Sequence, residues 1–456
     1  MALKIYNTLT ASKQEFKPLK KSEVKFYQCG PTVYWTQHIG NMRAMIMADL
    51  INRTLQYLGY KVNFVRNYTD VGHLTSDTDE GEDKMEIGAK REKLSPEEIA
   101  NKYIKIFEQD TADLNILEPA AKPKATENID EILEMIKIML EKKFAYQTEL
   151  AVYFDVSKAK DYNRLSGQIL EKQKTEAEDQ NKKHPADFVL WFFTIGKHKN
   201  AFQHWTSPWG EGFPGWHIEC SAIVRKFLGK TIDIHMGGIE HIPIHHTNEI
   251  AQSEAVNNAP FVNYWLHNEH LLVDNKKMAK SEGTGYSLAE IKEKGFSPLS
   301  LRYFFLQAHY RSKQNFTWEA LESAQNGLKH LYNQARELGE KKNEVNQEYK
   351  EKFIEAISDD FNIPQVLAIS QELLKSDLSN GSKLATILDF DKVLGLKISD
   401  AIKPEKIPQE VWELAEQRLK ARNQEKWELA DEIRERIRKK GYEIEDTEEG
   451  YNIKNI

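Results

Sequence analysis

The sequence predicts an α/β protein with a Rossmann-like parallel-sheet domain that carries an insertion, followed by an α-helical bundle and a small C-terminal domain. Three observations support this fold class. Strand-like and helix-like segments alternate early in the chain, which is the pattern of parallel sheets. From Ser297 onward the apolar residues keep helical spacing. A break with two prolines at residues 402–408 then precedes a last segment rich in Arg and Lys.

The first elements form a strand, helix, strand unit. Val24–Cys29 alternates as a strand does, residues 40–57 carry apolar residues at helical spacing, and Lys61–Arg66 is typical of a second strand. Units of this kind bind ligands at the carboxyl ends of their strands. Cys29 and Thr69 lie at those ends, so we expect both near a binding site.

Residues 115–200 are interpreted as an insertion between two halves of the sheet domain. Before it, residues 95–114 form a helix that starts with Ser, Pro and Glu at positions favouring a helix N-terminus. Within the insertion we expect a helix at 129–140, a strand at 149–156 and a mobile surface loop at 170–184, where apolar residues are scarce.

Residues 187–193, near the end of the insertion, predict a buried strand. The second half of the sheet domain follows the insertion, and there Ile232–His235 predicts another strand of the sheet. Trp205, Trp209 and Trp216 lie close together in sequence, an arrangement that more often reflects packing than a ligand cage.

The C-terminal third is expected to be helical. Apolar stripes between residues 321 and 374 indicate a helix bundle. After the break, a basic helix over residues 418–440 and a short hairpin over 442–456 are expected. The acids of this segment nearly balance its bases, so a solvated helical face and an RNA-binding surface both stay open.

Composition places the 456-residue chain among ordinary soluble proteins. Hydrophobic residues make up 40% and charged residues 29%. No apolar run approaches the ~18 residues of a membrane span, and the first residues lack a secretory signal, so we expect a cytoplasmic protein without membrane association. The net charge of −7 does not indicate a nucleic-acid partner, and any contact with phosphates would have to be made by local basic patches. Two cysteines cannot form a disulfide framework.

Metal-ligand residue types are concentrated between Gly215 and Glu254. Cys220 is followed by several histidines and by Glu249, and His245 and Glu249 share one helix face at i and i+4. With Cys29 they offer two thiolates, an imidazole and a carboxylate, a set that zinc accepts. The residues alone leave open a purely structural alternative, in which the cysteines are buried apolar residues and His245 caps a helix.

Two short motifs suit phosphate chemistry. HIGN (residues 38–41) stands at a predicted helix start, where free N–H groups and the helix dipole favour phosphate. KMAKS (residues 277–281) lies on a Gly-rich turn whose lysines could close over a polyphosphate. Alone, each motif is weak evidence, since a histidine near a helix start is often a cap and a basic loop is often only solvated.

Together these two motifs resemble the signature motifs of class I aminoacyl-tRNA synthetases. The surrounding segments FYQCGPTVY, SPWGEGFPGWHIECSAI, HHTNEIAQSEA, LRYFFLQAHYRS and DDFNIPQVLA narrow the resemblance to the cysteinyl-tRNA synthetase family. The resemblance spans nearly the whole chain. It implies activation of L-cysteine with ATP and Mg²⁺, transfer of the cysteinyl group to tRNA(Cys), and a monomeric enzyme.

The resemblance also implies roles for particular residues. The implied ligands of one zinc ion per chain are Cys29, Cys220, His245 and Glu249. That ion would hold the thiolate of the substrate and thereby reject serine. The implied ATP contacts are His38, Gly40, Asn41, Gly237, Gly238, Lys277 and Lys280, with both lysines stabilising the pentavalent phosphorus and the leaving pyrophosphate. Thr69, Trp216 and His235 are candidates for the rim of the cysteine pocket.

By the same resemblance the chain divides into six regions. These are the two halves of the catalytic domain, the insertion, a KMSKS-loop and stem-contact region, the helical bundle and an anticodon-binding domain, at residues 1–114, 201–270, 115–200, 271–318, 319–402 and 403–456. Three positions depart from the family pattern: Asn41 stands where His is usual, Ala279 where Ser is usual, and residues 71–74 replace a more acidic run.

Two rival functions fit part of the pattern. A cysteine ligase that passes cysteinyl adenylate to an amino-sugar would resemble the catalytic half but would lack the C-terminal end present here. A catalytically silent paralogue that keeps zinc and RNA binding would be expected to lose His38, the lysines of KMAKS or a zinc ligand, and all of these residues are present.

Overall fold

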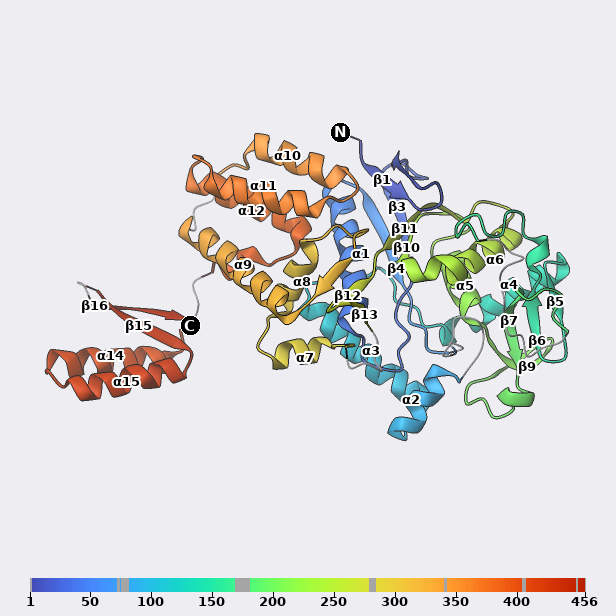
Figure 1. Cartoon of the computed structure of the whole chain (residues 1–456), viewed down its shortest axis with the longest axis horizontal. Helices are drawn as coiled ribbons and strands as arrows, with labels where there is room; N and C mark the ends of the chain where they lie inside the picture. Colours follow the sequence, from blue (N-terminus) through green and yellow to red (C-terminus); the bar gives the residue numbers. More distant parts are fainter. Residues whose placement is uncertain are drawn as a thin grey trace. The chain divides into compact units, whose positions relative to one another are not determined.

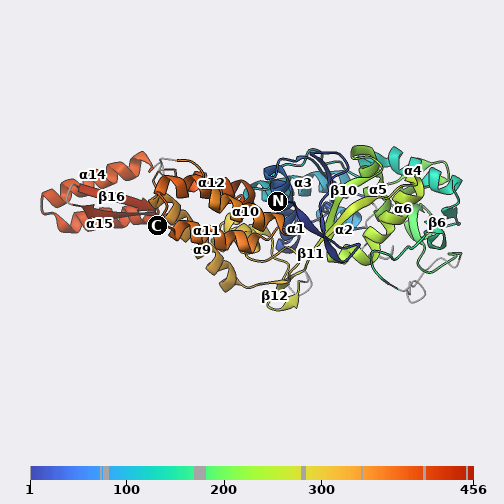
Figure 2. The ribbon, with the colours of Figure 1, turned by 90° about the horizontal axis from the view of Figure 1, so that it is seen from above.

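The computed structural model describes residues 2–71, 74, 82–168, 181–278, 284–339, 343–403, 407–447 and 450–455. The chain forms two compact units, Met1–Ala401 and Ile402–Ile456, and their boundary falls at the linker expected from the sequence. Figures 1 and 2 show the elements of each unit. No helix among the described residues is long and apolar enough to cross a membrane.

A four-stranded parallel sheet forms the centre of the first unit, and it confirms the predicted fold class. Its order is β11-β10-β3-β4. Every neighbouring pair is parallel, and the strands are β3 (Glu23–Gln28), β4 (Lys61–Arg66), β10 (Ile232–Gly238) and β11 (Val262–Asn268). Figures 1 and 2 show α1 (Ile39–Tyr57) on one side of this sheet and α5 (Trp216–Phe227) and α6 (Thr247–Asn257) on the other.

The register of the sheet aligns its apolar side chains. Phe26 of β3 lies opposite Phe64 of β4 and Ile234 of β10, and all three are buried. Helix α1 ends where expected, because Gly59 adopts φ +90°, a conformation that glycine accepts without strain. The strand, helix, strand unit predicted from the sequence is therefore confirmed.

An antiparallel sheet is inserted between the two halves of the parallel sheet. Its order is β5-β6-β7-β9-β8, with strands β5 (Ala145–Gln147), β6 (Ala151–Phe154), β7 (Phe188–Phe193), β9 (Gly210–Pro214) and β8 (Trp205–Ser207). Residues 191–193 pair with residues 212–214, so the sheet continues past residue 200. Trp205 and Trp209 pack against its core, as expected for packing tryptophans.

The remaining elements of the first unit are mostly helices. They are β1 (Lys4–Asn7), β2 (Ser12–Glu15), α2 (Lys84–Glu92), α3 (Pro96–Asp113), α4 (Ile129–Glu141), β12 (Leu271–Val273), β13 (Lys276–Lys277), α7 (Leu288–Glu293), α8 (Pro298–Leu306), β14 (Gln314–Phe316), α9 (Trp318–Glu337), α10 (Gln347–Ser358), α11 (Ile363–Lys375), α12 (Asn380–Leu394) and α13 (Ile398–Ala401). The capping box predicted at the start of α3 is present, with reciprocal bonds between Ser95 and Glu98.

The second unit corrects one expectation. The single basic helix predicted over residues 418–440 is wrong, because α14 (Gln409–Asn423) and α15 (Trp427–Lys439) are separate helices. They are separated at Glu425, which adopts φ +59°. The expected hairpin is present as β15 (Tyr442–Thr447) and β16 (Gly450–Asn455), and Arg418 and Arg422 both pair with Asp446 of β15.

A buried ion-pair network ties α1 to the helical part of the first unit. Asp49 of α1 accepts hydrogen bonds from Arg302 Nη2 at 2.7 Å and from Arg53 Nε at 2.8 Å. Arg302 also donates to the carbonyl of Leu394, at the end of α12. Burial raises the pKa of Asp49, but the charges of Arg302 and Arg53 outweigh it and keep the pKa below its ordinary value.

Removing Arg302 tests how far the fold depends on this network. Arg302→Met would leave the buried Asp49 carboxylate short of one of its two cations, which is expected to cost about 3 kcal/mol. The thermal unfolding midpoint of the first unit should fall by several degrees. Lys20→Met, which removes an exposed pair with Glu23, is the control and should leave the midpoint in place. Equal midpoints for the two variants would contradict the importance of the network.

Candidate active site

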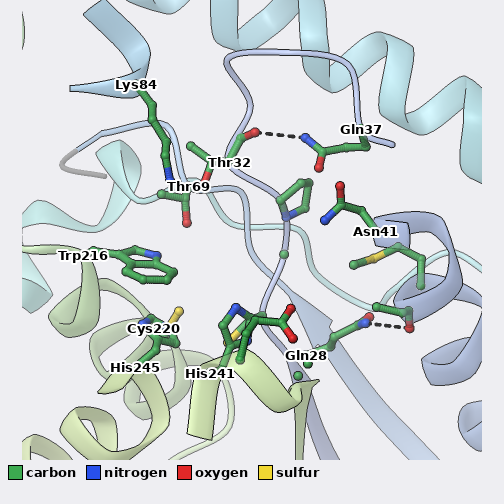
Figure 3. A pocket seen from close by; sticks show the side chains of 18 of the residues that line it. Gln28, Thr32, Gln37, Asn41, Thr69, Lys84, Trp216, Cys220, His241 and His245 are labelled. Atoms are coloured by element: carbon green, nitrogen blue, oxygen red, sulfur yellow. Dashed lines mark hydrogen bonds between the residues drawn. The ribbon is translucent and has the colours of Figure 1, made fainter. Parts of the chain in front are cut away.

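A pocket of about 340 Å³ opens at the carboxyl ends of the parallel strands. Cys29, after β3, and Gly237 and Gly238, at the end of β10, line it together with the start of α1. Figure 3 shows Trp216, Cys220 and His245 grouped on one side and Asn41 on the opposite side. Cys29 and Thr69, which the sequence places at the ends of strands, both line the pocket.

Four potential metal donors meet at the inner end of the pocket. Cys29, Cys220, His245 and Glu249 are all buried, and their donor atoms lie within 4.8 Å of one another. Cys220 comes from α5. His245 lies on a turn of π-helix, Ile242–His246, that leads directly into α6 with Glu249, so the i, i+4 spacing faces both toward the cysteines.

The neighbours of these donors have the arrangement typical of metal sites. His235 Nε2 lies 2.7 Å from Glu249 Oε2, and His217 Nδ1 lies 2.9 Å from His245 Nδ1. His245 Nε2 is buried, lies 2.8 Å from Glu249 Oε1 and yet makes no hydrogen bond. Partners that fix an imidazole and a carboxylate while one donor atom stays unsatisfied fit a bound cation. The sulfur, nitrogen and oxygen donors suit zinc.

The pKa shifts of the donor residues also indicate a site for a cation. A hydrogen bond from Cys29 lowers the pKa of Cys220 to about 6. Burial raises the pKa of Cys29 well above its ordinary value, and Cys220 raises it further. Burial opposes the charge of His245, but Glu249 and Cys220 outweigh it and raise the pKa of His245 to about 10. The Cys220 thiolate and the Glu249 carboxylate therefore both contact the positively charged imidazole of His245. A divalent metal could supply this positive charge instead.

His235 and His246 lie behind the donor cluster. His235 is fully buried, stacks on Trp265 with ring centroids 4.6 Å apart, and is not among the residues that line the pocket. The sequence predicts His235 at the rim of the cysteine pocket. In the structure His235 lies behind the donors, where it orients the Glu249 carboxylate. His246 Nε2 lies 3.5 Å from Cys29 Sγ, and Cys29, His235, His246 and Glu249 form a second group with donor atoms within 4.8 Å.

The start of α1 is built by the first motif. His38 is the N-cap, its Nδ1 accepts a hydrogen bond from the backbone N–H of Asn41 at 3.2 Å, and Asn41 Oδ1 accepts from the N–H of His38 at 3.3 Å. This capping box holds both side chains at the pocket. A Cβ on Gly40 would lie 3.1 Å from the His38 ring, so a larger residue there would push on the imidazole.

Met278, in the described part of the second motif, lies close to the first motif. A Cβ built on Gly40 would lie 3.6 Å from Met278 Cε. The backbone N–H of Ile39 donates a hydrogen bond to the carbonyl of Tyr286, beyond the motif, at 2.8 Å. Lys277 belongs to β13, which pairs with β12. Lys280 lies outside the described residues.

Gly237 and Gly238 line the pocket at the end of β10. A Cβ on Gly237 would lie 2.6 Å from His241 Nδ1, and one on Gly238 would lie 2.2 Å from the Glu240 carboxylate. The absence of a side chain at both positions therefore lets these neighbours approach the backbone of β10 closely.

Some residues that line the pocket carried no signal in the sequence, nor did Asn67, which does not line it but contacts Gly30 and Thr69, which do. Asn67 Oδ1 accepts from the N–H of Gly30 at 2.8 Å and from Tyr27 Oη at 2.9 Å, while its Nδ2 donates to Thr69 Oγ1 at 3.2 Å. It thereby fixes the orientation of Thr69. The pocket residues that were not predicted include Gln28, Tyr34, Gln37, Lys84, Glu240 and His241.

Comparisons with known proteins agree with this geometry. Residues 15–326 match the model of the family described as tRNA synthetases class I (C) catalytic domain. The chain is 42% identical to a cysteine–tRNA ligase of Treponema denticola over 98% of each chain, and 41% identical to cysteine–tRNA ligase 1 of Burkholderia lata over 99% of this chain and 97% of that one. The solved methionyl-tRNA synthetase of Mycobacterium tuberculosis shares the fold, with a TM-score of 0.57 over 84% of this chain and 92% of that chain at 13% identity.

The parallel sheet, its inserted antiparallel sheet and the matched catalytic domain define a class I aminoacyl-tRNA synthetase. Within that class, identity of about 40% over nearly the full length shows that the chain belongs to the cysteine–tRNA ligase family.

Replacing His235 tests its role behind the metal donors. His235→Phe keeps the stacking on Trp265 but removes the nitrogen beside Glu249, so zinc affinity should fall by ~10–100-fold. Competition with a chromophoric chelator would measure it. His204→Phe, on the exposed part of the insertion, is the matched control. Unchanged affinity in the His235 variant would show that this imidazole does not support the site.

Proposed function

We propose that the chain joins L-cysteine to ATP, forming cysteinyl adenylate and pyrophosphate, and then transfers the cysteinyl group to a terminal ribose hydroxyl of tRNA(Cys). One observation carries the proposal. A buried sulfur, nitrogen and oxygen donor set and a capped helix N-terminus line the same pocket, so a thiol-containing amino acid and a triphosphate can meet there.

The donor cluster would select the amino acid. Zinc held by Cys29, Cys220, His245 and Glu249 would supply a thiophilic position for the substrate sulfur, which a serine hydroxyl fills poorly. The ring of Trp216 stacks on His245 with centroids 4.2 Å apart, so it closes the pocket beside the metal donors. The Thr69 hydroxyl, fixed by Asn67, is placed to orient the polar end of the amino acid.

The start of α1 would hold the triphosphate of ATP. Backbone N–H groups and the helix dipole favour anionic oxygens, and the cap fixes His38 and Asn41 toward the pocket. Asn41 fills the position where the family pattern has His, and its side chain serves the helix cap. Gly237 and Gly238, which line the same pocket, would lie along the adenosine. Lys277 and Lys280, with Mg²⁺ on ATP, would neutralise charge on the leaving pyrophosphate.

The rest of the chain would serve tRNA. We assign residues 115–200, together with β8 and β9 of the same antiparallel sheet, to the connective insertion. We assign 271–318 to the loop and stem-contact region, 319–402 to the bundle, and 403–456 to anticodon binding by a monomer. In the second unit, acids and bases balance along α14 and α15, but the last turn of α15 gathers Arg436, Arg438 and Lys439, a local basic group that supports this assignment.

The direct test is cysteine-dependent exchange of pyrophosphate into ATP, followed by charging of unfractionated tRNA with labelled cysteine. Both reactions should occur. Exchange without charging would indicate an amino-sugar or another acceptor, and no exchange by zinc-loaded protein would indicate a silent paralogue. Either result would overturn the proposed function.

Cys220→Ser tests the role of the donor cluster. Loss of a thiolate should reduce zinc content and lower the preference for cysteine over serine by roughly 100-fold or more, since disturbing even a supporting partner costs ~10–100-fold. Metal analysis and exchange rates with each amino acid measure the two effects. Phe227→Ser, on the exposed side of the same helix, is the control. Full zinc content with unchanged discrimination would remove Cys220 from the site.

A further inference from the structure

Lys84 brings a cation into the pocket from an element outside the parallel sheet. It is the first residue of α2, and it lines the pocket together with Thr69, Trp216 and Cys220. Figure 3 shows its side chain extending from α2 toward Thr69, on the side of the pocket that holds Trp216 and Cys220, with Asn41 on the other side. None of the roles considered above uses this residue.

The stability of α2 does not explain a lysine at this position. A cation in the first turn of a helix opposes the helix dipole. The rest of α2 follows the favourable rule, with Asp83 as N-cap, Glu86 in the first turn, and Lys90 and Arg91 in the last turn. What the structure shows for Lys84 is that it brings a cation to the lining of the pocket.

The geometry indicates which anion this cation meets. The proposed function, on which this inference rests, places the substrate sulfur at Cys220 and His245 and the triphosphate at the opposite side, near Asn41. Only the α and β carbons of cysteine separate its sulfur from its carboxylate. A carboxylate this close to the sulfur can reach the side of the pocket that Thr69, Trp216 and Lys84 share, and Lys84 offers an anion a cation there.

We propose that the ammonium group of Lys84 binds the α-carboxylate of the substrate cysteine. During activation a carboxylate oxygen forms a bond to the α-phosphorus of ATP, the bond from that phosphorus to the β-phosphate oxygen breaks, and pyrophosphate leaves with the electron pair. Lys84 transfers no proton in this step. It orients the nucleophile, and because its contact is already made in the bound substrate, its loss should weaken cysteine binding more than it slows turnover.

The test compares two ligands on zinc-loaded protein. Cysteinol keeps the thiol and amine of cysteine but has a hydroxymethyl group in place of the carboxylate. In Lys84→Met, the Kd for cysteine measured by calorimetry should rise by ~10–100-fold, the loss expected for a charged hydrogen bond, while the Kd for cysteinol stays the same. The KM for cysteine in pyrophosphate exchange should rise in parallel, with little change in kcat.

Matched variants guard against a structural effect. Lys90→Met, on the same helix, removes an exposed lysine that pairs with Glu86 and should change neither Kd. Lys84→Arg should recover part of the cysteine affinity. Zinc content should be equal in all variants.

Three results would overturn the proposal. Equal losses for cysteine and cysteinol would make Lys84 a structural residue. A raised KM for ATP with unchanged cysteine binding would place it on the α-phosphate. Unchanged Kd values for cysteine and cysteinol, together with an unchanged KM for ATP, would show that Lys84 binds neither the amino acid nor ATP. Wild-type protein that binds cysteine but shows no exchange would contradict the proposed function alone, because the comparison of the two ligands would still decide the role of Lys84.

Discussion

Two cysteines, a histidine and a glutamate are buried together at one edge of the parallel sheet, and their placement constrains the rest of the structure. Charges removed from water are costly unless they are paired. The donors come from the end of β3, from α5 and from the start of α6, so the order of the parallel strands has to bring these segments to one edge. The buried imidazoles of His217 and His235 then hold His245 and Glu249 in place.

The same edge of the sheet connects the two halves of the reaction. The helix that starts at His38 presents its N-terminus to the pocket, and further along this helix Asp49 pairs with Arg302 of α8. Helix α1, and with it the proposed phosphate site, is thus fixed by a capping box at its start and by a buried ion pair further along. A rigid attachment of this kind suits chemistry that depends on positioning, since no covalent bond to the protein is needed.

Much of the fold could be predicted because its signals are local. The β3, α1 and β4 segments have clear periodicity and turn residues, and the cap at Ser95 can be read from adjacent positions. The site was harder. No local spacing relates Cys29 to Cys220, so the residues alone left zinc open until the resemblance and the buried cluster agreed. The burial of His235 and the approach of Lys84 depend on packing between distant elements, and the break at Glu425 depends on one left-handed residue.

The most direct test of the metal-centred account is the X-ray absorption spectrum of zinc in the loaded protein, recorded without and with cysteine. The account predicts two sulfur donors and two lighter donors from Cys29, Cys220, His245 and Glu249, with one further sulfur when cysteine is added. A spectrum with no sulfur donors, or one that cysteine leaves unchanged, would contradict it.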